Sequence, residues 1–128
     1  MYRFAVKAFL VLSVLIAAVG CRSTPVYNVT NQSVGTAGGK AKSLQEVKTA
    51  IVEAGKARGW IMKEIAPGHL EAELRVRSHV AVVEIKYSPT SYSITHKNST
   101  NLNYDGTNIH PNYNSWIQNL QRDIEKRL

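Results

Sequence analysis

The sequence holds a single cysteine, Cys21, so no disulfide can form within the chain and no pair of thiols can bind a metal. It also lacks common catalytic motifs: there is no Gly-x-Ser-x-Gly elbow, no phosphate-binding P-loop and no His-Glu-x-x-His pair. Acidic residues are few, nine against 16 basic ones, yet the basic residues form no arginine-rich run. These absences argue against nucleic-acid binding and against a disulfide-stabilised domain.

The one long apolar run lies at the N-terminus. It extends from Ala8 to Val19 and follows two basic residues, Arg3 and Lys7. A permanent membrane-spanning helix needs about 20 apolar residues, so a shorter run with this basic flank is typical of a secretory signal. We expect residues 1–20 to be a signal peptide that is removed on export.

The end of this run, Ala18-Val19-Gly20-Cys21, resembles the lipobox of bacterial lipoproteins. The resemblance implies cleavage before Cys21, a diacylglycerol on its sulfur and an acyl chain such as palmitate on its amino group, which together make a stable membrane anchor. The alternative is an ordinary signal that leaves Cys21 as a free thiol, a liability in an oxidising compartment. Arg22, in place of aspartate, suggests the outer membrane facing the periplasm under the sorting rule of enteric lipoproteins.

The remaining chain divides into a polar segment and one domain. Residues 22–42 are rich in Ser, Thr, Asn and Gly, which predicts a flexible tether, although residues 26–29 are compatible with a short edge strand. We expect a signal peptide at 1–20, a lipidated tether at 21–42 and a single α+β domain at 43–128.

Two amphipathic helices are predicted, one on each side of a run of strands. Ser43 to Glu46 is a capping box that begins the first helix, and Gly59 is suited to end it. The second helix follows Pro111, and its apolar residues recur with helical spacing: Tyr113, Trp116, Ile117, Leu120 and Ile124.

Between Trp60 and Lys97 the apolar residues alternate with polar ones, which predicts four strands. Short turns between them would place three apolar rows on the inner face: Ile65, Leu70, Tyr87 and Tyr92; Ala72, Ile85 and Ile94; Ile61, Leu74, Val83 and His96. The predicted fold is therefore a four-stranded antiparallel meander with two helices packed on one face, in the order α-β-β-β-β-α. In this register Trp60 and Met62 lie on the outward face, and we consider them a candidate docking surface.

The most unusual stretch is residues 101–116, NLNYDGTNIHPNYNSW. Much of it is typical of a turn and a helix start, because Asp-Gly favours a turn and asparagines cap free amides. Sites also gather on such loops and at helix N-termini, where anions bind. The candidate ligand-binding residues are Tyr104, Asp105, His110, Asn112 and Tyr113. His96 and His110 alone make a weak metal signal, so we expect neither a metal nor a cofactor.

Several segments together resemble a family of small uncharacterised bacterial lipoproteins: GW at 59–60, PG at 67–68, HVAVVEIKY at 79–87, YSI at 92–94 and NLNYDGTNIHPNYNSWIQNL at 101–120. The resemblance covers the chain from Gly59 to the C-terminus. It implies a lipoprotein with one compact domain, and it assigns no catalytic residues.

The sequence thus predicts a non-enzymatic envelope lipoprotein that acts as a binding or accessory module, with an anionic or glycan ligand at the loop from Tyr104 to Trp116. Two alternatives remain open. One is a small hydrolase or transferase that uses His110 and Asp105 with a serine such as Ser99 or Ser115. The other is a subunit that docks on an envelope protein through Trp60 and Met62.

Overall fold

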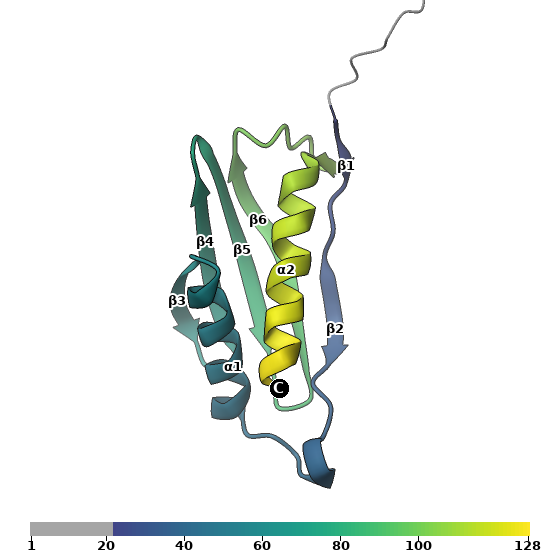
Figure 1. Ribbon diagram of the computed structural model, residues 1–128, viewed down its shortest axis with the longest axis vertical. Coiled ribbons are helices and arrows are strands. Elements are labelled where there is room, and N and C mark those ends of the chain that lie inside the picture. The colour runs from purple at the N-terminus through teal and green to yellow at the C-terminus, as the bar shows by residue number, and fades with distance from the viewer. Residues whose placement is uncertain (1–21) are drawn as a thin grey trace, which may run out of the picture.

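The computed structural model describes residues 22–128, so the predicted signal peptide and Cys21 lie outside the described residues. The fold is α+β, with two helices on one face of a five-stranded antiparallel sheet (Figure 1). The sheet has the order β2 (Val29–Ser33), β6 (Ser91–Thr100), β5 (His79–Tyr87), β4 (His69–Val76) and β3 (Ile61–Ala66). The remaining elements are β1 (Thr24–Pro25), which pairs with β7 (Asn108–Ile109), the short helix η1 (Ala37–Gly39), α1 (Leu44–Ala57) and α2 (Pro111–Arg127).

Both helices begin where the sequence predicts. Ser43 Oγ accepts a hydrogen bond from Glu46 N at the start of α1, and Pro111 occupies the first turn of α2. Each helix buries one apolar stripe against the inner face of the sheet, as helical spacing predicts. The buried residues are Val47, Ile51 and Ala54 from α1 and Tyr113, Ile117, Leu120 and Ile124 from α2.

The predicted register is correct between β5 and β6 and displaced by two residues between β4 and β5. Tyr87 pairs with Tyr92 and Ile85 with Ile94, as expected. Leu70, however, lies opposite Ile85 because the connecting turn is Arg77-Ser78, with Arg77 at a φ of 56°. A shift of two residues leaves every side chain on its predicted face, so the core is preserved.

The prediction for β3 is wrong by one residue, which reverses its faces. Pairing changes from Ala66 opposite His69 to Glu64 opposite Leu70, so a β-bulge lies between them. Beyond the bulge Ile61 points outward with 61% of its surface exposed, while Trp60 is buried. Met62 packs partly buried against the core. The predicted outward face with Trp60 and Met62 therefore does not exist.

The prediction of four strands is also corrected, because part of the expected tether joins the sheet. β2 pairs with β6 as a fifth strand and carries its own bulge between Val29 and Gln32. The side chain of Asn114 holds the preceding residues against α2. Its Oδ1 accepts from Tyr27 N at 2.9 Å, and its Nδ2 donates to Thr24 Oγ1 and to Pro25 O, each at 2.9 Å.

Replacing Gly68 with alanine should lower the free energy of unfolding by about 1–3 kcal/mol in urea titrations, because Gly68 has a φ of +80° and an added Cβ would lie 2.9 Å from Tyr87 O. Gly35→Ala is the matched control, since Gly35 has a φ of +75° but no neighbouring atom within 4 Å of an added Cβ. Equal losses in the two variants would show that the contact with Tyr87 has no effect.

Candidate functional site

The loop between β6 and α2 is built by short-range hydrogen bonds. Asn101 and Asn103 adopt positive φ values of 57° and 52°, which asparagine tolerates better than most residues. Asp105 Oδ1 accepts from Thr107 N at 2.9 Å and from Asn108 N at 2.7 Å, and these amides hold the pKa of Asp105 below its usual range. The Asp105 carboxylate therefore closes a turn.

His110 has a similar local role at the start of α2. Its Nδ1 accepts a hydrogen bond from Asn112 N at 3.1 Å, as an N-cap side chain does. The two serines considered for a catalytic triad are bonded elsewhere, Ser99 to His96 and Ser115 to Pro111. No hydrogen bond or ion pair joins His110 to Asp105 within residues 22–128.

Two of the predicted site residues do meet, around a histidine on β6. The ring centroid of His96 lies 4.0 Å from that of Tyr104 and 5.4 Å from that of Tyr113. His96 Nε2 lies 3.0 Å from Ser99 Oγ, and burial lowers the pKa of this histidine. Asn112 is exposed and takes no part in this cluster, so the five predicted residues do not form one site.

Tyr113 is a core residue with an unsatisfied hydroxyl. Its side chain is fully buried, and its Oη has no hydrogen-bond partner among the described residues. Burial raises the pKa of Tyr113, with a smaller contribution from Tyr104. The hydroxyl is thus kept protonated in the interior without a compensating bond.

A second row of rings lies nearby and was not predicted. His79, the first residue of β5, has its ring centroid 6.2 Å from His110 and 6.3 Å from Trp116. Its Nδ1 lies 2.6 Å from Asn101 O, which ties the start of β5 to the loop. The turn at Arg77-Ser78 is only two residues long, so His79 already belongs to β5 and pairs with Val76.

Trp116 also lines a groove between α1, β4 and α2, which we call the tryptophan groove. It has a volume of about 180 Å³ and is lined by Arg58, Trp60, Leu74, Val76, Trp116 and Asn119. Arg58 follows the last residue of α1, and its guanidinium forms two hydrogen bonds with Asp123 of α2, Nε to Oδ2 at 2.6 Å and Nη2 to Oδ1 at 3.3 Å. This pairing lowers the pKa of Asp123 and leaves the Arg58 side chain 44% exposed at the groove.

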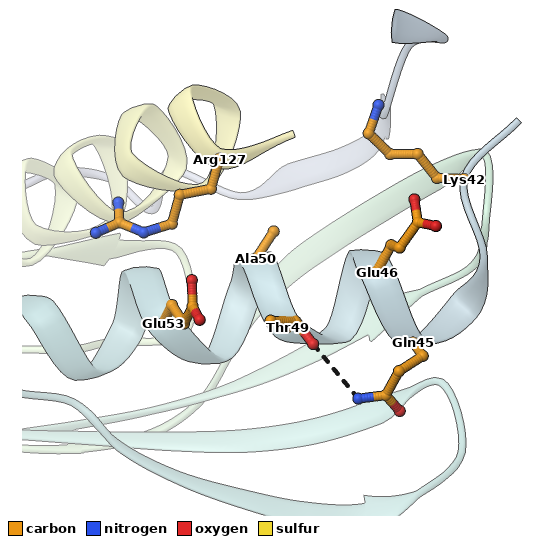
Figure 2. Close-up of a pocket in the computed structure, with 7 residues that line it drawn as sticks. All are labelled: Lys42, Gln45, Glu46, Thr49, Ala50, Glu53 and Arg127. Atoms are coloured by element: carbon orange, nitrogen blue, oxygen red, sulfur yellow. Dashed lines mark hydrogen bonds between the residues drawn. The ribbon is translucent and has the colours of Figure 1, made fainter. Parts of the chain in front are cut away.

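A larger groove, of about 310 Å³, lies on the outer side of α1, where Arg127 of α2 approaches it (Figure 2). Its lining mixes cations and carboxylates: Lys42, Gln45, Glu46, Thr49, Ala50, Glu53 and Arg127. It holds no aromatic ring, and Gln45 donates to Thr49 within the same helix at 3.4 Å. Charges of both signs on one open surface select neither cations nor anions, so the tryptophan groove is the better candidate site.

Within residues 22–128, no three His, Cys, Asp or Glu side chains gather in a way that would hold a metal ion. In the same part of the chain, neither helix has the length and apolar content needed to cross a bilayer.

Comparisons of the chain with protein-family models, with curated proteins and with solved structures find no match. The groove and the loop are therefore interpreted from their own chemistry.

Tyr113→Phe should raise the free energy of unfolding by about 1 kcal/mol, because it removes a buried hydroxyl that has no partner within the described residues. Tyr27→Phe is the control with the opposite expectation, since Tyr27 Oη donates to Gln121 Oε1 at 2.5 Å and its loss should cost about 1 kcal/mol. Both are measured by urea unfolding. A clear loss of stability in Tyr113→Phe would contradict the assignment of an unpartnered hydroxyl.

Proposed function

We propose that the protein is a non-enzymatic lipoprotein of the bacterial envelope, anchored through Cys21 in the outer membrane and facing the periplasm. The lipobox-like Ala18-Val19-Gly20-Cys21 supports the anchor. There the domain serves as a binding or accessory module. Asp105 and His110 each satisfy backbone amides locally, which favours binding over the hydrolase or transferase alternative.

The observation that carries the binding role is the tryptophan groove. Its lining includes the partly exposed indole ring of Trp116 and the guanidinium of Arg58, and Asp123 uses only some of the N–H donors of that guanidinium. An indole face offers a flat apolar surface, and the remaining guanidinium donors suit a carboxylate. Asn119 adds an amide that can donate and accept. A sugar acid presents all the complementary groups, so an anionic glycan is the ligand class that this groove fits best.

Cys21→Ser should move the protein from the membrane fraction to the soluble periplasmic fraction, because without the acylated cysteine no stable anchor remains. Fractionation followed by immunoblotting measures this. Arg22→Lys is the control and should stay in the membrane fraction. Persistent membrane retention of Cys21→Ser would contradict anchoring through this residue.

The domain should bind glucuronate more tightly than glucose, and Trp116→Leu should weaken glucuronate binding about tenfold, the equivalent of about 1.4 kcal/mol. Amide shifts of Trp116 and Asn119 in NMR titrations measure the affinity. Gln45→Ala changes the other groove and should bind like the unaltered domain. Equal affinity for the two sugars, or a loss in Gln45→Ala alone, would overturn the assignment.

A further inference from the structure

The first described residues are fastened to one end of the domain. Thr24 pairs with Ile109 across the β1–β7 ladder, and Val26 N donates to Thr107 O at 3.0 Å. Asn114 Nδ2 donates to Thr24 Oγ1 at 2.9 Å. The chain therefore enters the fold at a set position, beside the loop that joins β6 to α2.

We use the name loop end for this pole of the molecule, made of residues 22–25, 76–79 and 100–112. The turn at 77–78 belongs to it because Asn101 Nδ2 donates to Ser78 Oγ at 2.7 Å. Figure 1 shows the β4–β5 turn, the loop after β6, the start of α2 and β1 together at one extreme of the longest axis. The C-terminus and η1 lie toward the opposite extreme.

A lipid on Cys21 would hold the loop end at the bilayer. Only Arg22 and Ser23 lie between Cys21 and Thr24, and even a fully extended chain spans at most about 11 Å from one to the other. The headgroup layer on each side of a bilayer is itself about 5–8 Å thick. An anchor inserted in the hydrocarbon core thus leaves no room for Thr24 to lie far above the headgroups.

The chemistry of the loop end suits that position. Tyr104 is 44% exposed there, and tyrosine is enriched at the level of lipid headgroups. Arg22 and Arg77 are exposed cations. Asp105 is the one acidic residue within these three ranges, and two backbone amides already bond to its carboxylate. Anionic headgroups attract cations that lie this close to the surface.

We propose that the loop end is a membrane-contact surface, on which Tyr104 rests among the headgroups and Arg22 and Arg77 bind the phosphates of anionic lipids. The inference rests on the proposed lipid anchor at Cys21. It orients the domain with the start of α2 at the membrane and its C-terminus directed away. The 17 residues of α2 span about 25 Å, so the last turn of α2 lies well outside the headgroup layer.

The test uses the lipidated full-length protein in vesicles of phosphatidylethanolamine with a minor fraction of phosphatidylglycerol. Since the only native cysteine is acylated, Thr107→Cys and Lys126→Cys each provide one thiol for a fluorescent label, at the loop end and in the last turn of α2. Lipids with a spin-labelled headgroup should quench the label at residue 107 several-fold more than that at residue 126. Equal quenching, or stronger quenching at residue 126, overturns the proposed orientation.

The role of the arginines has its own test on the same labelled protein. Arg22→Gln with Arg77→Gln should reduce quenching at residue 107 in these vesicles and have little effect in pure phosphatidylcholine. Lys40→Gln with Lys126→Gln removes the same charge away from the loop end and should change nothing. An unchanged signal in the double arginine variant overturns the phosphate contacts.

Vesicle flotation distinguishes a failure of the lipid anchor from a failure of the membrane-contact surface. Protein that does not float with the vesicles shows that the anchor itself has failed. Protein that floats but gives equal quenching at both labels refutes only the membrane-contact surface.

Discussion

The side-chain amide of Asn114 is the contact on which the arrangement of the N-terminal segment depends. One side chain on the first turns of α2 accepts from Tyr27 and donates to Thr24 and Pro25. These bonds hold the chain alongside the helix before it enters β2, and they set the β1–β7 ladder beside the loop after β6. β2 itself is held by its ladder with β6 and by the buried side chains of Val29 and Val34, so the Asn114 bonds act on the residues that precede β2.

The parts of the fold that could be predicted are those determined by local sequence. Ser43 and Pro111 begin the helices, and alternation in β5 and β6 gives the correct pairs because their turn is short. The errors arise where one residue more or less changes the register. The bulge near Glu64 has no signature in composition, yet it turns Trp60 inward and Ile61 outward. The sequence allowed a short edge strand at residues 26–29 within the tether, whereas β2 spans Val29–Ser33 and joins the domain. An edge strand is held by main-chain bonds and needs few apolar side chains, so its position is hard to predict.

In the candidate site too, the sequence predicted local features but not the contacts between distant elements. The asparagines, Asp105 and His110 of the loop were recognised as unusual, but most of their polar groups satisfy backbone amides, as the capping interpretation predicts. The tryptophan groove could not be found from sequence, because Arg58, Leu74 and Trp116 come from three elements that are far apart along the chain. Trp60 also lines this groove, and its inward orientation follows from the β3 register, which the sequence did not predict.

Both edge strands of the sheet, β2 and β3, carry a bulge. A bulge interrupts the regular row of free amides and carbonyls that another strand would need for pairing along the whole edge. If the protein is anchored at Cys21 as proposed, neighbouring copies stand in the same orientation and meet by two-dimensional diffusion, and this protection gains importance. Irregular edges on both sides then disfavour strand pairing between crowded copies, so that a dense layer of such domains stays a layer of separate molecules.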